Sequence, residues 1–145
     1  DALAERGARV VLVDGQTPAA GSELAQRATI LQVLDVEVRT GPQATAALPD
    51  ALDLDVIVTS PGWRPDQPLL AAAAAAGIPV WGEVELAWRM RPAEGAAPWL
   101  TLTGTNGKTT TVQMLASILR AAGLRATSAG NVGTPMLEAV LHRAV

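Results

Sequence analysis

Short apolar runs alternate along the chain with longer stretches in which apolar residues recur every three or four positions. The short runs predict strands, since a parallel strand buried on both faces is apolar throughout. They cover residues 9–15, 36–40, 54–60, 78–81, 99–103 and 125–128. The periodic stretches predict amphipathic helices, at 23–34, 43–48, 69–76, 83–90, 108–122 and from about 136 onward. This alternation indicates an α/β fold built on parallel sheets.

Residues that end or begin helices mark several of these boundaries. Gly7, Gly77 and Gly123 follow predicted helices as C-caps, and Ser22 precedes one as an N-cap. Residues 1–6 resemble the last turns of a helix. We therefore expect that an earlier strand and loop precede Asp1 in a longer protein.

A segment rich in proline, glycine and alanine at 92–98 lacks apolar periodicity. Such segments separate domains. We therefore predict a first domain over residues 1–91, a linker over 92–98, and a second domain that begins in 99–145.

Composition narrows the functional class. The chain is 49% hydrophobic and 17% charged, with a net charge of −3, so no basic nucleic-acid footprint is present. It contains no cysteine, which rules out a disulfide framework within it and makes the cytoplasm the default expectation. No apolar run reaches the length of a membrane span, so we expect no membrane insertion, and we expect a monomer.

The most informative stretch is a glycine-bearing turn between a predicted strand and a predicted helix. It reads Thr103-Gly104-Thr105-Asn106-Gly107-Lys108-Thr109-Thr110. Glycines allow a tight turn whose N–H groups face an anion, and the following helix adds its free amides. Lys108 can reach the β- and γ-phosphates of a nucleotide, and the Thr109 hydroxyl is placed to bind Mg²⁺. This is the layout of a phosphate-binding P-loop.

The loop departs from the general P-loop pattern in one position. That pattern has glycine five residues before Gly107, where this chain has Leu102. The departure makes an ordinary P-loop kinase a weaker candidate.

Two further strand ends carry candidate ligand-binding residues. Asp14 ends the first predicted strand, where Rossmann-type units place a carboxylate that binds a ribose or a base edge. Ser60, Pro61 and Gly62 follow another strand and would face the ligand crevice of an open sheet. In both places a simple solvent-exposed turn remains an alternative.

A second glycine-rich loop, Gly130-Asn131-Val132-Gly133-Thr134-Pro135, precedes the last predicted helix. Asn131 offers both a hydrogen-bond donor and an acceptor. If its strand lies beside the P-loop strand, Asn131 lies near the γ-phosphate. We interpret the single histidine, His142, as a surface or packing residue rather than a catalyst.

Together these motifs resemble the Mur ligases. The resemblance rests on the loop at 103–110, on Ser60-Pro61-Gly62, on Gly77-Ile78-Pro79-Val80-Trp81-Gly82-Glu83, and on the loop at 130–135, which is similar to the branch that adds D-glutamate. It implies a Rossmann-like parallel-sheet domain that binds a UDP-linked substrate, followed by the start of a P-loop ATPase-type α/β domain.

The resemblance also implies an activity and residue roles. ATP would phosphorylate the carboxylate of UDP-N-acetylmuramoyl-L-alanine, and the amine of D-glutamate would displace the phosphate, a step of peptidoglycan synthesis. Residues Gly104, Thr105, Asn106, Gly107, Lys108, Thr109 and Thr110 would bind ATP, with Thr109 on Mg²⁺ and Lys108 and Thr109 as catalytic residues. Asp14, Gly15 and Gln16 would bind the uridine, and Ser60, Pro61, Gly62 and Asn131 would lie near the pyrophosphate.

The second metal ligands, the adenine site and the D-glutamate site are expected to follow Val145. We therefore expect no ligase turnover from these 145 residues alone. Two alternatives stay open: a folylpolyglutamate synthase-type ligase, which shares the ATP loop, and a non-catalytic nucleotide-binding module.

Overall fold

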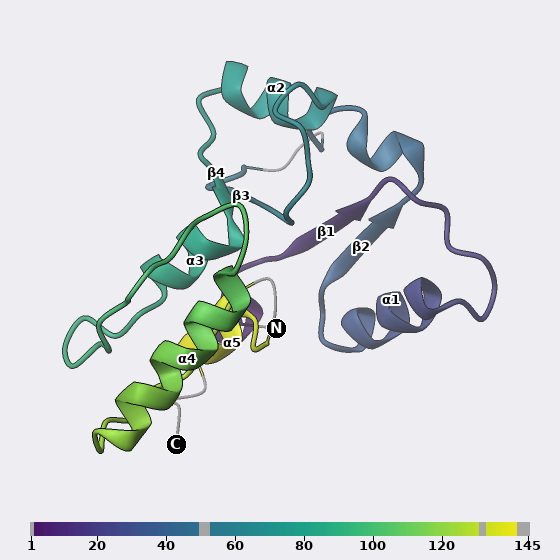
Figure 1. Cartoon of the computed structure of the whole chain (residues 1–145). Helices are drawn as coiled ribbons and strands as arrows, with labels where there is room; N and C mark the ends of the chain where they lie inside the picture. Colours follow the sequence, from purple (N-terminus) through teal and green to yellow (C-terminus); the bar gives the residue numbers. More distant parts are fainter. Residues whose placement is uncertain (1, 50–52, 131–132, 142–145) are drawn as a thin grey trace. The chain divides into compact units, whose positions relative to one another are not determined.

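A computed structural model describes residues 2–49, 53–130 and 133–141 (Figure 1). Its contacts divide the chain into two compact units, Asp1–Val80 and Trp81–Val145. Among the residues described, none of the helices combines the length and the apolar character that a membrane-spanning helix needs. The predicted domain boundary at 92–98 stays a prediction.

The first unit is built on a strand–helix–strand motif. Strand β1 (Val11–Asp14) pairs in parallel with β2 (Glu37–Thr40), from Val11 opposite Glu37 to Asp14 opposite Thr40 (Figure 1). Helix α1 (Glu23–Val33) connects the two strands and packs against β2. A short 3-10 helix, η1 (Ala4–Arg6), precedes β1, and another, η2 (Pro42–Thr45), follows β2 and contacts both strands. The predicted α/β class, with parallel strand pairing, is confirmed.

The buried part of the first unit centres on helix α2 (Pro68–Ala75). Leu69, Leu70 and Ala73 on one face of α2 are almost fully buried, as is Val36. Strands β3 (Ile57–Thr59) and β4 (Val80–Gly82) flank α2 in the sequence and form a second two-stranded sheet. Ile57 N–H donates to the carbonyl of Pro79 at 2.9 Å. The alanine-rich helix is therefore a core element, because small side chains let its neighbours approach closely.

The described residues of the second unit include three helices: α3 (Glu83–Arg89), α4 (Lys108–Ala121) and α5 (Met136–Leu141). Helix α3 packs against α5, and Leu86 and Ala87 of α3 are buried. The N–H of Leu137 donates to a carboxylate oxygen of Glu83 at 3.4 Å, which links the starts of these two helices. The predicted helices are thus confirmed in this unit.

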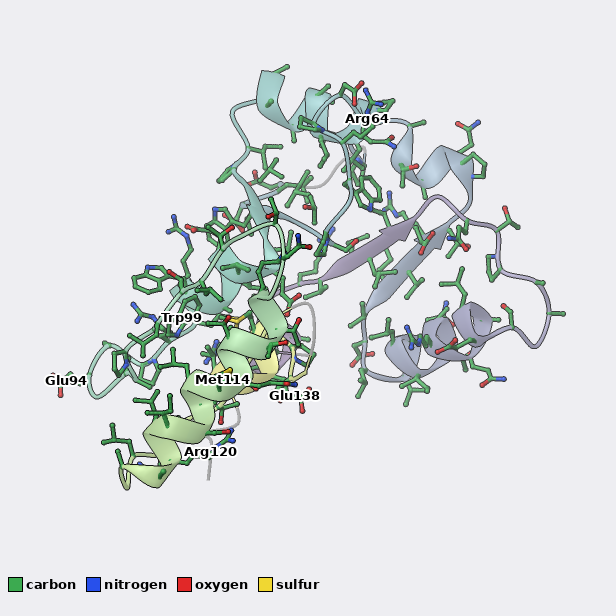
Figure 2. All side chains as sticks on the ribbon, viewed as in Figure 1. Arg64, Glu94, Trp99, Met114, Arg120 and Glu138 are labelled. Carbon is green, nitrogen blue, oxygen red and sulfur yellow. The ribbon has the colours of Figure 1, made fainter. Side chains whose placement is uncertain are left out.

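A cluster of tryptophan and arginine side chains ties the segment after α3 back onto that helix. The rings of Trp88 and Trp99 meet edge to face with centroids 5.1 Å apart. The guanidinium of Arg91 lies 3.3 Å from the centroid of the Trp88 ring, a cation–π geometry. Trp99 is labelled beside α3 in Figure 2. Residue 99 is therefore anchored through its side chain rather than through a sheet.

Two predicted strands are not formed. Residues 99–103 are irregular, with Leu100 63% exposed, and 125–128 form no strand; nearby, Ala129 and Thr134 make an isolated bridge. A strand exists only by hydrogen bonding to a partner strand, and within 2–49, 53–130 and 133–141 no partner pairs with either segment. Their β-prone composition alone does not suffice.

The helical spacing of the apolar residues in α4 predicts one buried stripe, which the structure confirms only in part; the stripe comprises Val112, Leu115, Ile118, Leu119 and Ala122. Ala116 is the buried residue of this helix, with Val112 and Leu119 half-buried. Leu115 and Ile118, which the prediction placed on the buried stripe, are exposed, as is Met114 (Figure 2). Residues 112, 116 and 119, spaced four and three positions apart, therefore form the least exposed row of the helix surface.

The capping residues predicted from the sequence are found at the helix ends. The Ala25 N–H donates to Ser22 Oγ at 3.2 Å, and Gly7, Gly77 and Gly123 adopt left-handed φ angles of 82°, 71° and 80°. Capping is a local interaction, so sequence alone predicts it.

We expect Ser22→Ala to lower the free energy of unfolding by about 1 kcal/mol, because the Ala25 N–H loses its acceptor at the start of α1. Urea unfolding followed by circular dichroism measures this change. Thr29→Ala is the matched control in the same helix. Thr29 Oγ1 only donates back to the carbonyl of Ala25, so this change should cost less than about 0.5 kcal/mol. Equal losses from the two variants would contradict the capping role.

Candidate functional site

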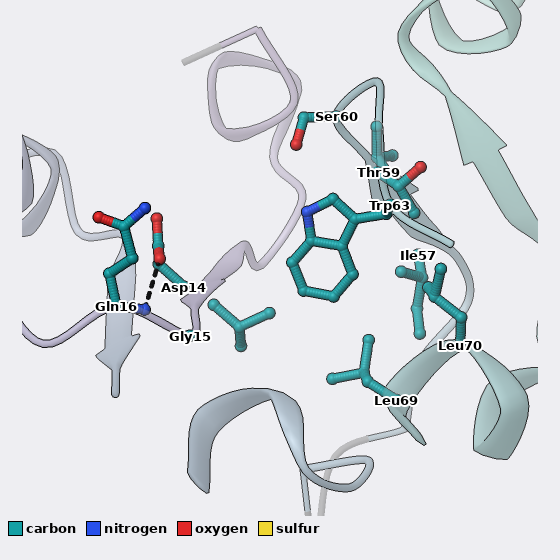
Figure 3. Close-up of a pocket in the computed structure, with 11 residues that line it drawn as sticks. Asp14, Gly15, Gln16, Ile57, Thr59, Ser60, Trp63, Leu69 and Leu70 are labelled. Atoms are coloured by element: carbon teal, nitrogen blue, oxygen red, sulfur yellow. Dashed lines mark hydrogen bonds between the residues drawn. The ribbon is translucent and has the colours of Figure 1, made fainter. Parts of the chain in front are cut away.

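A cavity of about 400 Å³ opens at the carboxyl ends of β1 and β3, within the first unit (Figure 3). The two strand ends, the loop after β3 and the start of α2 line it. The lining residues are Val13, Asp14, Gly15, Gln16, Ile57, Val58, Thr59, Ser60, Trp63, Leu69 and Leu70. A crevice at the carboxyl ends of parallel strands is the usual ligand position in open α/β sheets.

Backbone hydrogen bonds hold the turn at 14–16 in place. The N–H of Gly41 donates to the carbonyls of Asp14 and Gln16, at 2.8 and 2.9 Å. The N–H of Gln16 donates to Asp14 Oδ1 at 2.8 Å, which fixes the carboxylate over the turn (Figure 3). A Cβ added at Gly15 would lie 3.1 Å from Thr45 Oγ1, so the turn passes close to η2 and favours glycine. Asp14 is half-buried as a residue, and its carboxylate keeps acceptor capacity for a ligand.

The structure brings four of the seven predicted substrate-binding residues to this cavity: Asp14, Gly15, Gln16 and Ser60. Pro61 and Gly62 are exposed and do not line it, although Gly62 adopts a left-handed φ of 99° that turns the chain after Ser60. Asn131 and His142 lie outside the described residues.

Sequence reasoning missed Trp63, Leu69 and Leu70, which also line the cavity. Leu69 and Leu70 are core residues of α2, but Trp63 is only half-buried (Figure 3). The sequence did contain a feature that could have indicated Trp63. This residue directly follows Ser60-Pro61-Gly62, so it had to lie at the same edge of the sheet.

The glycine-bearing loop of the second unit ends at the first residue of α4. Gly107 is the N-cap of α4 with φ 75° and ψ −2°, and its carbonyl accepts the Thr111 N–H at 2.9 Å. Residues 104–110 are all exposed. The free amides of the first turn of α4 and the loop are therefore accessible to an anion.

Lys108 folds back across this loop. Its Nζ donates to the carbonyl of Gly104 at 2.6 Å, so the ammonium lies over the turn rather than extending into solvent. Thr109 and Thr110 follow in the first turn of α4. The predicted ATP-binding residues thus form one continuous exposed stretch, from the loop into the first turn of α4, with a positive charge held over the loop.

Residues 102–141, which include this loop and α4, match the Mur ligase middle domain family. Taken with the relatives below, this match shows that the chain belongs to the Mur ligase family. The resemblance inferred from the loop motifs is therefore confirmed.

Three similar relatives carry the name UDP-N-acetylmuramoylalanine--D-glutamate ligase. The chain is 63% identical to that of Streptomyces avermitilis over 115 residues, which are 79% of this chain and 24% of the relative. It is 55% identical to that of Streptomyces coelicolor over 137 residues, 92% of this chain and 27% of the relative. It is 53% identical to that of Thermobifida fusca over 140 residues, 97% of this chain and 28% of the relative. The chain spans about a quarter of the length of the curated relatives it matches.

We expect Gly107→Ala to destabilise the chain by about 1–2 kcal/mol, because a non-glycine residue is strained in the left-handed region. A Cβ at position 107 would meet no atom within 4 Å, so the cost comes from the backbone and not from a clash. Gly82→Ala is the matched control: it also has open space, but its φ is −82°, which alanine adopts freely. Urea unfolding measures the loss in the free energy of unfolding for both variants. Similar losses would argue against backbone strain at position 107 as the cause.

Proposed function

We propose that this chain forms the UDP-substrate-binding and ATP-loop parts of a ligase that joins D-glutamate to UDP-N-acetylmuramoyl-L-alanine at the expense of ATP. The observation that carries the proposal is Lys108, held over a glycine-capped helix N-terminus inside the stretch that matches the Mur ligase middle domain. The name shared by the relatives specifies the amino acid and the nucleotide-linked acceptor.

In this proposal Gly104, Thr105, Asn106, Gly107, Lys108, Thr109 and Thr110 bind the phosphates of ATP. The loop and α4 amides donate to phosphate oxygens, and Lys108 exchanges its bond to the Gly104 carbonyl for bonds to the β- and γ-phosphates. This exchange replaces a neutral acceptor by a charged one, which strengthens the hydrogen bond.

The residues of the loop fit a magnesium ion that is carried with the nucleotide. Thr109 supplies a hydroxyl oxygen in the first turn of α4. Phosphate oxygens of the nucleotide and water would supply further ligands, because Mg²⁺ prefers oxygen donors and keeps several waters. Bound there, the ion neutralises phosphate charge during transfer.

The cavity of the first unit binds the uridine end of the substrate. Asp14, Gly15 and Gln16 contact the nucleoside, and Ser60, Pro61 and Gly62 bind near the diphosphate. Asn131, which lies outside the described residues, is assigned to diphosphate binding by the family resemblance alone. This assignment makes residues 1–91 a Rossmann-like domain, 92–98 a linker, and 99–145 the start of a P-loop domain. Remote binding of the uridine then holds the reactive carboxylate in position for transfer.

The reaction needs carboxylate activation, because a carboxylate oxygen is a poor leaving group. Oxygen of the terminal carboxylate attacks the γ-phosphorus of ATP, the bond to the ADP oxygen breaks, and an acyl phosphate forms. The neutral amine of D-glutamate attacks the acyl carbon, releases inorganic phosphate and loses a proton to give the amide. Lys108 and the loop amides stabilise the charge that develops on the transferred phosphoryl group.

The names of the relatives favour this activity over a folylpolyglutamate synthase-type ligase. A non-catalytic nucleotide-binding module would keep both binding sites without coupling them. Cytoplasmic location and a monomeric state remain part of the proposal.

Lys108→Ala should weaken Mg-ATP binding at least tenfold and leave the binding of UDP-N-acetylmuramoyl-L-alanine unchanged, because hydrogen bonds to charged groups contribute about 1.5–3 kcal/mol. Isothermal titration calorimetry with each ligand measures both effects.

Arg120→Gln provides a matched control, since it removes a positive charge from the same helix about 18 Å away along its axis. It should leave both affinities unchanged. A wild-type chain that fails to bind Mg-ATP, or a Lys108→Ala variant that loses both ligands equally, would refute the proposed division of sites.

Lys108 is the only lysine in the sequence, which permits a second measurement. Mg-ATP should protect its amine from acetylation, detected by mass spectrometry of the peptide that contains it.

A further inference from the structure

The cavity at the ends of β1 and β3 has an unusual charge content for a nucleotide site. Among the described residues that line it, Asp14 is the one with a charged side chain, and none is a lysine or an arginine. A diphosphate needs positive charge or a set of amide donors. The cavity itself therefore suits a neutral portion of a ligand that donates hydrogen bonds to a carboxylate and has flat apolar faces.

Trp63 supplies an aromatic surface for such a ligand. Figure 3 shows its indole between the turn at Asp14 and Gly15 and the end of β3, with Leu69 nearby. Leu69 is 3% exposed and Leu70 7% exposed, so these residues form the floor of the cavity. Trp63 is half-buried, which leaves part of the indole accessible to a ligand.

We propose that Trp63 is the stacking platform for the pyrimidine base of the UDP-linked substrate, and that Asp14 accepts a hydrogen bond from the same nucleoside. This inference rests on the proposed function, whose residue assignments do not include Trp63. Aromatic side chains bind bases by stacking on their π faces. A cavity of about 400 Å³ lies within the range of small-molecule sites.

The turn before Trp63 supports a positioning role for the backbone. Gly62 has φ 99°, so the chain reverses after Ser60 and delivers the residue that follows to the cavity wall.

UDP binding tests the proposal. Trp63 is the only tryptophan in residues 1–80, and the other three are Trp81, Trp88 and Trp99. UDP should change the tryptophan fluorescence of the wild type and of Trp81→Phe, the control, whereas Trp63→Leu should lose the change. Trp63→Leu keeps an apolar side chain but no π face, and should weaken UDP binding by about five- to 100-fold in calorimetry. Trp63→Phe should restore most of the affinity.

A ligand variant makes the test independent of protein folding. 5,6-Dihydro-UDP keeps the hydrogen-bonding groups of the base but is neither planar nor aromatic, so the wild type should bind it more weakly than UDP. In Trp63→Leu the difference in affinity between UDP and dihydro-UDP should largely vanish. The substitution in the protein and the change in the base both remove the same stacking interaction.

The outcomes separate the two proposals. If the wild type does not bind UDP, the proposed function fails. If the wild type binds UDP but Trp63→Leu binds it equally well, or if dihydro-UDP binds the wild type as tightly as UDP does, stacking on Trp63 is overturned while the proposed function stands.

Discussion

Parallel pairing of β1 with β2 is the constraint on which the first unit depends. Four residue pairs in register place Asp14 at the end of β1 opposite Thr40, and the next residue, Gly41, donates its N–H to the turn at 14–16. That turn holds the carboxylate at the cavity. Parallel strands cannot be joined by a tight turn, so α1 must cross between them, and its Ser22 cap begins that crossing.

The second unit depends on backbone conformation at one residue. Gly107 in the left-handed region ends the loop and starts α4, so that consecutive amides and Lys108 belong to one exposed turn. The two sites also differ in charge. The cavity of the first unit offers a carboxylate and an indole, and the loop of the second offers an ammonium and free amides. This contrast supports the proposal that a nucleoside binds at the first site and phosphates bind at the second.

Features that depend on neighbouring residues could be predicted from the sequence. The glycine-bearing loop, the start of α4 at Lys108 and the capping residues are set by interactions over a few positions. Features that depend on distant partners could not. Residues 99–103 have the composition of a strand but no strand pairs with them in the described residues, and Trp99 packs on Trp88 instead. Likewise Ala116, rather than Leu115, is the buried residue of α4.

The same distinction between local features and contacts with distant residues applies to the candidate cavity. The sequence by itself determined that Asp14 and Ser60 follow strands, since an apolar run and the residues that end it are local features. Only the tertiary structure decided that these residues share one cavity with Trp63 and with the floor formed by α2. The physical reason is that a cavity wall consists of side chains brought together by strand pairing and helix packing, and those contacts join residues that are far apart in the chain.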